Sequence, residues 1–286
     1  MKPHVLISLT SIPRRLDGSL PEILAGLKRQ RLKSQILVNI PTHYRKWGAV
    51  EIPQALREIE DVIVFSPSKD YGPGTKLLGA LEYIQQHPEI THVITVDDDM
   101  VIDDDRYLQH LAAHARALPN YAVTFGGIKL DRYPFKYLDG LSYDHHHRFV
   151  DGVAGFRGVL YPVHLMRGSQ LPFTFFENLP AGAVNDDDAY FGIVLSVMKI
   201  PLLAIPIRAG GEAVKVSELE GGSGVEEQVD KGRTQNEMEI FQHAVKAGYF
   251  SFSRGNATRQ LTPMERLALF LIRLRNKLRR VMEGQH

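Results

Sequence analysis

The stretch of sequence that decides the fold is "THVITVDDDMVIDDD", residues 91–105, in which an apolar run leads into two triplets of aspartate. The run 91–96 is rich in β-branched residues and has the length of a buried strand. Six carboxylates then follow within nine residues, and they repel one another unless positive charge lies among them. The stretch therefore predicts a strand that ends at a site where cations gather.

Strand-like and helix-like segments alternate through the first half of the chain. The strand-like segments are apolar runs of six or seven residues: 4–10, 35–41, 61–67 and 91–96. The helix-like segments repeat apolar residues at helical spacing: 20–30, 77–84 and 104–118. This alternation predicts an α/β fold with a mainly parallel central sheet and helices on both faces, in which ligands bind at the carboxyl ends of the strands.

The second half is less regular. Glycine-punctuated strands are expected in 121–130 and 147–162, a helix in 187–199, a strand in 200–206 and a helix near 234–247. The Gly-rich segment 209–224 reads as a loop, either a flap over a ligand or a disordered segment.

Composition narrows the class of protein. The 286 residues carry a formal net charge of +1 and include no cysteine, which excludes a disulfide framework and a thiolate metal site. No apolar run approaches the length of a membrane span, and the first residues do not form a signal sequence. These features favour a cytoplasmic protein.

The two aspartate triplets call for different interpretations. Asp97 and Asp99 point to the same side if strand geometry continues, so their carboxylates can converge on one Mg²⁺ or Mn²⁺ together with phosphate oxygens. Asp103, Asp104 and Asp105 lie where acidic residues stabilise the start of the next helix. Only the first triplet is therefore expected to form a metal–diphosphate site.

A second candidate anion site precedes the helix at 77–84. The loop "DYGPGTK" (70–76) brings two glycines and Lys76 to the amino end of that helix, a natural seat for an anionic group. Two interpretations stay open: the glycines serve only a tight turn, or Lys76 contacts phosphate or the metal site.

The order of these motifs resembles the GT-A fold of nucleotide-sugar glycosyltransferases, the family-2-like enzymes in particular. The matching segments are "LISLTSIPRRL" (6–16), "DYGPGTKL" (70–77), "VDDDM" (96–100), "GVAGFRGVLYP" (152–162) and "NDDDAYFGIVLSVMKIP" (185–201). The resemblance implies a Rossmann-like, GT-A-like sheet and transfer of a hexose from a nucleotide-sugar donor, with a UDP-sugar favoured, in polysaccharide assembly.

Carried over residue by residue, the resemblance assigns roles in donor binding and catalysis. Thr10 and Ser11 would lie beside the nucleotide, Asp70 would contact its base or ribose, and Lys76 and Asp98 would complete the donor site. Asp97 would hold the ribose or the metal, and Asp99 the metal.

The pair Asp187–Asp188 corresponds to the position where inverting members keep their general base, and Asp188 is its better candidate. The chain departs from the family-2 pattern in having Asp rather than Glu before this base and in lacking the arginine often found in the helix that follows. The acceptor is expected to be a hydroxyl of a glycan or of a lipid-linked molecule, and Phe175 and Phe176 are the expected acceptor contacts.

Two alternative functions fit the same acidic residues. A haloacid-dehalogenase-type phosphatase dependent on Mg²⁺ would also place Asp97, Asp99 and Val101 after an apolar strand, with Asp187–Asp188 as a later acidic pair. A non-catalytic, membrane-associated protein that holds a structural cation would use the same carboxylates.

The C-terminal segment is distinct in charge. From Arg259 onward seven basic residues stand against two acidic ones, a charge of about +5, and leucines recur at helical spacing in 263–282. We expect a transferase domain at 1–255 and a basic amphipathic helix at 256–286 that lies on the inner face of a membrane. Docking of this helix on the protein itself or on a second subunit would fit the same pattern. Nucleic acid is not expected as a partner, because the basic residues are confined to one helix.

Overall fold

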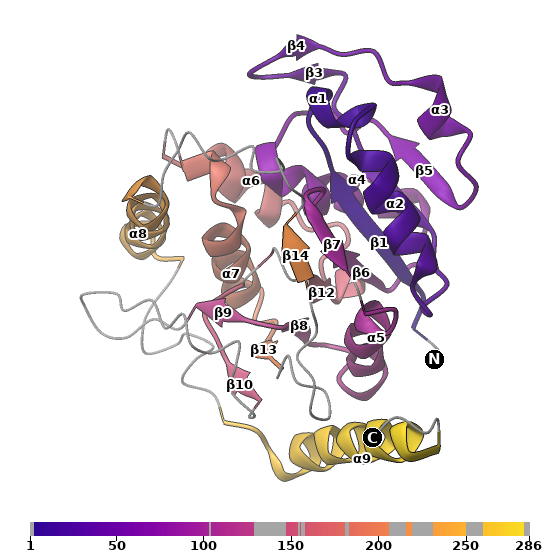
Figure 1. Ribbon diagram of the computed structural model, residues 1–286. Coiled ribbons are helices and arrows are strands. Elements are labelled where there is room, and N and C mark those ends of the chain that lie inside the picture. Colours follow the sequence, from indigo (N-terminus) through magenta and orange to yellow (C-terminus); the bar gives the residue numbers. More distant parts are fainter. Residues whose placement is uncertain are drawn as a thin grey trace.

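The chain forms a mixed α/β structure around one central sheet, seen in a computed structural model (Figure 1). The structure describes residues 3–102, 104–128, 147–153, 155, 158–180, 183–205, 216–218, 231–249 and 260–282. The strands of the central sheet are β1 (Val5–Thr10), β2 (Ile36–Asn39), β5 (Val62–Phe65), β6 (His92–Thr95), β8 (Ala122–Thr124), β10 (Arg148–Phe149), β12 (Val159–Tyr161) and β13 (Leu202–Ala204).

The order of strands across this sheet is β10-β13-β8-β12-β6-β1-β2-β5. The four strands from β5 to β6 are parallel, with the doubly wound arrangement of a Rossmann-like half. β12 runs antiparallel between β6 and β8, and β10 runs antiparallel at the far edge. Six of the eight strands thus run in one direction, which confirms the expected mainly parallel α/β sheet.

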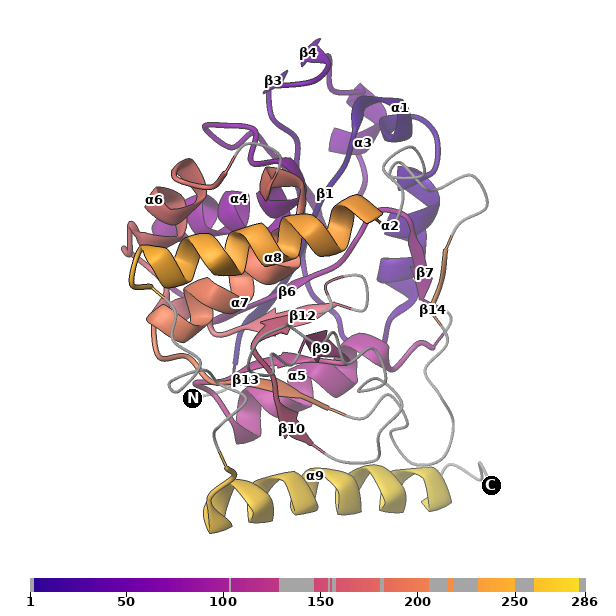
Figure 2. The ribbon, with the colours of Figure 1, turned by 90° about the vertical axis from the view of Figure 1, so that its left-hand side faces the viewer.

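Helices cover both faces of the sheet (Figure 2). Those of seven or more residues are α2 (Leu20–Arg29), α4 (Thr75–Tyr83), α5 (Tyr107–Ala117), α6 (Leu171–Glu177), α7 (Asp187–Val197), α8 (Lys231–Lys246) and α9 (Pro263–Met282). Shorter ones are α1 (Pro13–Leu16), α3 (Gln54–Arg57) and the 3-10 turns η1 (Gly72–Gly74), η2 (Ile84–Gln86), η5 (Val163–Leu165) and η6 (Ala183–Asn185).

Successive side chains of β1 point to opposite faces of the sheet, and each face is covered by its own layer of helices. Leu6 packs with α4, α6, α7 and α8 in one apolar cluster, whereas Ile7 and Leu9 pack with α1, α2, α3 and α5 in a second cluster on the opposite face. Because both faces are buried, apolar residues occupy both sides of the strand, and the one buried polar residue among them, Ser8, is hydrogen-bonded.

Three small sheets lie outside the central one. They are β3 (His43–Tyr44) with β4 (Gly48–Ala49), β9 (Gly127–Ile128) with β11 (Gly152–Val153), and β7 (Met100–Ile102) with β14 (Val216–Glu218). The strand expected in 121–130 is thus divided into β8 and β9, and the one expected in 147–162 into β10, β11 and β12.

Candidate active site

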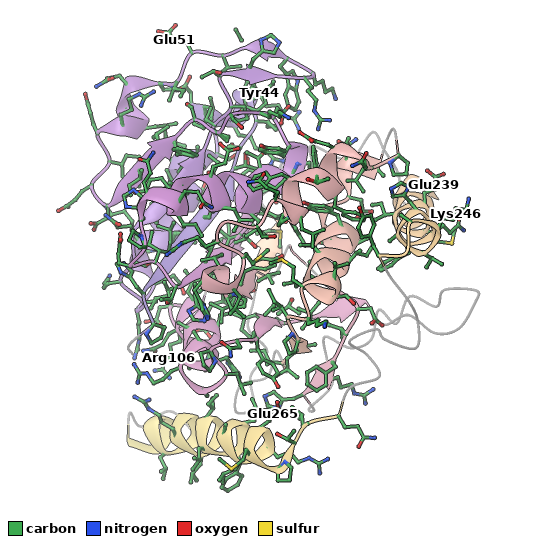
Figure 3. The ribbon with its side chains drawn as sticks, turned by 180° about the vertical axis from the view of Figure 1, so that it is seen from behind. Tyr44, Glu51, Arg106, Glu239, Lys246 and Glu265 are labelled. Carbon is green, nitrogen blue, oxygen red and sulfur yellow. The ribbon has the colours of Figure 1, made fainter. Side chains whose placement is uncertain are left out.

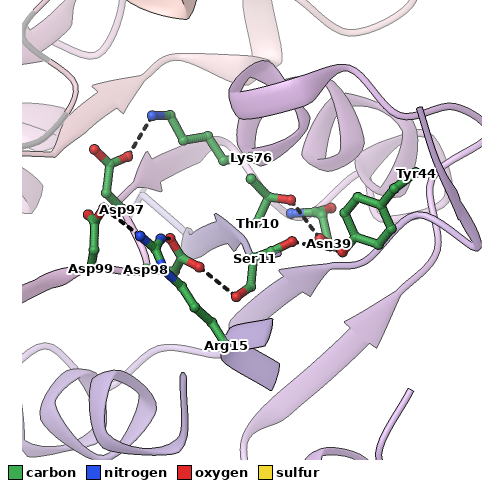
Figure 4. Close-up of polar contacts among 9 residues, drawn as sticks. All are labelled: Thr10, Ser11, Arg15, Asn39, Tyr44, Lys76, Asp97, Asp98 and Asp99. Carbon is green, nitrogen blue, oxygen red and sulfur yellow. Dashed lines mark hydrogen bonds and ion pairs between the residues drawn. The ribbon is translucent and has the colours of Figure 1, made fainter. Parts of the chain in front are cut away.

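The first aspartate triplet lies between β6 and β7, at the carboxyl edge of the parallel strands. The end of β1, the short helix α1 and the first turn of α4 meet the triplet at the same edge (Figure 4). This is the edge at which ligands bind in open α/β sheets.

Asp98, the middle member of the triplet, is buried and held inside the protein. Ser11 Oγ donates a hydrogen bond to its Oδ2 over 2.5 Å, and Arg15 Nη1 forms an ion pair with its Oδ1. Burial raises the pKa of the Asp98 carboxyl, while Arg15 and Ser11 act in the opposite direction. Because both oxygens are engaged, Asp98 fixes the loop, and Asp97 and Asp99 are left nearer to solvent.

Arg15 links two members of the triplet. Its Nη2 lies 3.2 Å from Asp99 Oδ2, and the arginine itself is only 8% exposed. A buried guanidinium is a suitable partner for several carboxylate oxygens, because its donors form a rigid fork. Arg15 is thus one of the positive groups that the sequence calls for among the aspartates.

Lys76 is the other positive group, and it joins two acidic segments that are about ninety residues apart. Its Nζ lies 2.6 Å from Asp97 Oδ1 and 2.8 Å from Asp187 Oδ2, and the lysine is 4% exposed. Burial alone would lower the pKa of Lys76, but Asp187, Asp97 and Asp188 together raise it well above its usual value. The lysine is therefore a permanent cation between the end of β6 and the start of α7.

Acidic groups still outnumber basic ones here. Burial and the charge of Asp97 raise the pKa of Asp99 to about 6, although Arg15 opposes the shift. The shift in the pKa of Asp99 reflects burial first and the like charge of Asp97 second, and Arg15 and Lys76 do not fully offset it. A bound cation would relieve that imbalance.

The two outer aspartates, Asp97 and Asp99, could supply only part of the ligand set of a magnesium or manganese ion. Lys76 pairs with Asp97 Oδ1 and Arg15 with Asp99 Oδ2, so each aspartate has one oxygen paired with a basic side chain. The side chains of Asp97 and Asp99 are each 26% exposed. Within the described ranges there is no cluster of three or more residues able to hold a metal. An ion here would thus depend on one or two carboxylates plus phosphate oxygens and water, the mode in which Mg²⁺ is usually held at phosphate sites.

Asp188, in the first turn of α7, contacts the backbone of a glycine. Gly155 N donates to Asp188 Oδ1 over 2.9 Å, and Asp188 is 5% exposed. A β-carbon on Gly155 would lie 2.5 Å from that oxygen and 3.4 Å from Lys76 Nζ. Only glycine allows the backbone to approach so closely at this position.

The expected nucleotide contacts Thr10 and Asp70 lie around the same edge, and both are bonded within the protein. Thr10 Oγ1 donates to the Asn39 carbonyl over 2.8 Å. Asp70 accepts hydrogen bonds from the backbone N–H groups of Gly72 at 2.8 Å and Arg45 at 2.9 Å, which ties the loop before α4 to the β3–β4 hairpin.

A buried hydrogen-bond network positions α4 and with it Lys76. Ser8 Oγ donates to the Lys76 carbonyl over 2.6 Å, and Asn39 Nδ2 donates to Ser8 Oγ over 2.8 Å. These bonds join β1, β2 and the first turn of α4, so the position of Lys76 is set by the sheet.

Asp104 and Asp105 of the second triplet lie just before the helix α5, but neither lies in its first turn, so the expected stabilisation of the helix start is not seen for them. Asp104 Oδ1 accepts from the Arg106 N–H at 2.8 Å, and Asp105 pairs with Arg31 at the surface. The helix α5 begins at Tyr107 rather than at 104, and the strand β7 occupies residues 100–102 before it. Asp103 lies outside the described residues.

The Gly-rich segment 209–224 is not all loop. Val216–Glu218 form β14, which pairs antiparallel with β7 directly after the first triplet. The expectation of a loop is wrong for these three residues. The rest of the segment lies outside the described residues. The pairing brings a segment more than a hundred residues away beside Asp99.

Phe175 and Phe176 are not placed to contact an acceptor, so that prediction is wrong. Phe175 is 1% exposed and stacks on Tyr190, and Phe176 is 9% exposed and packs edge-on against Tyr190. Both belong to the core between α6 and α7, where aromatic side chains most often lie.

Arg15 and Gly155 were not among the predicted site residues, although both lie in segments that carry the resemblance. Arg15 follows β1 at the edge where carboxylates gather, so the need for counter-charge is a signal that points to it. The sequence does not point to Gly155 in the same way, because glycine is common in loops wherever the chain turns.

Comparisons with known proteins give only distant likenesses. No protein-family model matches the chain, and neither does any curated protein. A crystal structure of 4-diphosphocytidyl-2C-methyl-D-erythritol synthase is similar with 9% identity and a TM-score of 0.41, over 84% of this chain and 99% of that one. A crystal structure of S. aureus TarS is similar with 15% identity and a TM-score of 0.41, over 72% of this chain and 35% of that one. Likenesses at this level carry no argument, so the functional assignment depends on the geometry of the site.

Proposed function

We propose that the protein is a metal-dependent glycosyltransferase of the GT-A, family-2-like kind. It transfers a hexose with inversion from a nucleotide-sugar donor, most simply a UDP-sugar, to a hydroxyl of a glycan or a lipid-linked acceptor. The observation that carries the proposal is the contact of Lys76 with both Asp97 and Asp187. It supports one site that contains both the expected donor acids and the expected catalytic pair.

Donor binding is assigned to the carboxyl edge of β1 and β6. Asp97 and Asp99 would hold Mg²⁺ or Mn²⁺, and the ion would supply positive charge to the diphosphate and to the leaving group. Arg15 and Ser11 keep Asp98 in place and so set the direction in which its two neighbours point. Thr10 and Asp70 flank the nucleotide.

Asp188 acts as the general base. It removes the proton from the acceptor hydroxyl as that oxygen forms a bond to the anomeric carbon, while the bond from this carbon to the diphosphate oxygen breaks. Asp187 is less suitable for this role, because its carboxylate is already engaged in an ion pair with Lys76. The bond from Gly155 N orients the Asp188 carboxylate.

The phosphatase alternative receives less support from the topology. In such enzymes the Asp-x-Asp motif usually follows the first strand of the sheet, whereas Asp97 here follows β6, the fourth of the parallel strands, after β1, β2 and β5. A structural cation site without catalysis would give no reason for Asp187 and Asp188 to lie beside Lys76.

The experiment that tests the proposal is a calorimetric titration of the protein with UDP, GDP, CDP and dTDP, each with and without Mn²⁺. Tight binding of one nucleotide that requires the metal is the expected result. If none of the four binds, the glycosyltransferase proposal fails, and release of phosphate from p-nitrophenyl phosphate with Mg²⁺ then tests the phosphatase.

A further inference from the structure

The helix α9 carries an apolar stripe that faces away from the protein. Six of the nine large apolar residues exposed in the described part of the chain belong to it: Met264, Leu267, Phe270, Leu271, Leu274 and Leu278. Their exposed fractions run from 41% to 74%. Spacings of three and four residues place them on one side of the helix.

The opposite side of α9 is docked on the protein. Leu269 is 3% exposed, and it packs with Ala268 and Ile272 into the apolar cluster that contains α5. Tyr121 Oη donates to Glu265 Oε1, and Figure 3 shows Glu265 on the side of α9 toward the rest of the chain. Docking on the protein therefore covers one side of the helix and leaves the stripe uncovered, along one edge of the molecule (Figure 2).

Charge distinguishes among partners that could cover the stripe. The sequence of α9 holds Arg266, Arg273, Arg275, Lys277, Arg279 and Arg280, and its one acidic residue, Glu265, is already engaged with Tyr121. In a two-fold pair of copies the same basic helix would face itself, and like charges would oppose the association. An acidic surface has the complementary charge.

We propose that α9 binds the surface of a membrane that contains anionic lipids. Its apolar stripe enters the boundary between headgroups and acyl chains, and its basic residues contact the headgroups. Within the described residues, no helix is long and apolar enough to cross a membrane. The inference depends on α9 alone and not on the proposed glycosyl transfer.

Vesicle co-sedimentation of the full chain tests the proposal. Binding to vesicles of phosphatidylglycerol and phosphatidylcholine is expected at low salt, with much weaker binding to vesicles of phosphatidylcholine alone. The double variant Leu271→Glu, Leu274→Glu should lower the partition coefficient at least about tenfold, because two apolar contacts are replaced by charges of the wrong sign. Arg275→Glu should lower the partition coefficient on anionic vesicles about thirtyfold, since the substitution changes the charge of the helix by two units near the membrane surface.

The matched control is Val245→Glu on α8, a residue 40% exposed, close to the 41% of Leu274. This variant should bind anionic vesicles as the wild type does. No binding of the wild type to anionic vesicles at low salt would overturn the proposal, as would equal loss of binding in Val245→Glu. If the wild type instead sediments as a dimer and the double variant Leu271→Glu, Leu274→Glu sediments as a monomer, the stripe binds a second copy of the chain and the membrane proposal fails.

Discussion

Lys76 is the residue on which the geometry of the site depends most. A buried ammonium in contact with carboxylates stabilises them, and removing one partner of such a group leaves uncompensated charge in the interior. Lys76→Met should therefore lower the free energy of unfolding by about 3–5 kcal/mol, as measured by urea denaturation.

Lys69→Met is the control for that measurement. Lys69 also forms an ion pair with a carboxylate, Glu177, but both side chains are more than half exposed. Loss of this surface ion pair should lower the free energy of unfolding by less than about 1 kcal/mol. Equal effects of the two substitutions would show that Lys76 does not compensate buried charge.

Gly155 tests the orientation of the proposed base. A methyl group at this position would lie 2.5 Å from Asp188 Oδ1, so Gly155→Ala must displace either the carboxylate or the backbone. We expect the turnover number to fall about 100-fold, because a shift of about 1 Å at a reacting group has costs of this order. The rate of donor hydrolysis measures the effect.

Gly26→Ala is the matched glycine substitution. Its β-carbon would meet only Arg29 Nη2, at 3.6 Å, and it lies inside α2. This variant should keep full activity and gain up to about 1 kcal/mol in stability. Normal turnover in Gly155→Ala would refute the role of the Gly155–Asp188 contact.

At the scale of residues, the sequence predicts which charges gather but not how they are paired. The resemblance places Asp97 and Asp187 in one site, and their common contact with Lys76 agrees with that placement. Burial of Asp98 by Arg15 could not be predicted, because strand periodicity gives the direction of a side chain and not its partner.

At the scale of elements, the four parallel strands β1, β2, β5 and β6 are predicted within one or two residues, because each is a mostly apolar run at least half buried in the sheet. β7 and β14 are not predicted, since they are three residues long and pair across more than a hundred positions. A short two-stranded pair depends on tertiary contacts rather than on local propensity.

The strand β6 begins with a buried histidine that makes the stability of the protein depend on pH. His92 is 2% exposed, and its Nε2 donates to the Pro119 carbonyl over 3.0 Å, which ties β6 to the end of α5. Burial lowers the pKa of His92 to about 4; the bond to Pro119 opposes this shift, and nearby His164 adds to it.

The sign of the effect follows from the proton count. Between pH 6.5 and 4 the unfolded chain binds a proton at His92 that the folded chain does not, so stability falls as the pH falls, by at most about 3 kcal/mol. Above pH 6.5 this contribution to the pH dependence vanishes. Urea denaturation at pH 4.5 and pH 7.5 measures the difference.

His92→Gln provides the comparison, because a glutamine amide can still donate to Pro119 but does not titrate. The loss of stability between pH 7.5 and 4.5 should be smaller in this variant than in the wild type. If the two proteins lose the same free energy, His92 is not responsible.

At the scale of the whole molecule, the α/β class and the parallel half follow from the sequence, whereas the arrangement of the second half does not. The antiparallel strand β12 lies between β6 and β8, far from its neighbours in the chain, and no periodicity specifies that position. The amphipathic pattern of 263–282 predicts α9 itself, but docking through Leu269 decides which side of it stays exposed.

The most direct test of the central claim is donor turnover by Asp188→Asn in the presence of Mn²⁺, with water as the acceptor. The first calorimetric titration identifies the nucleotide, and release of that nucleoside diphosphate from its sugar reports the rate. Asp105→Asn is the control, since Asp105 belongs to the second triplet and forms a surface pair with Arg31.

Asp188→Asn should lower the rate by about 100- to 10,000-fold while the dissociation constant of the nucleotide stays within about threefold of the wild type. Asp105→Asn should change neither quantity. Unchanged turnover in Asp188→Asn would contradict the account, because the residue beside Lys76 and Gly155 would then not be the base.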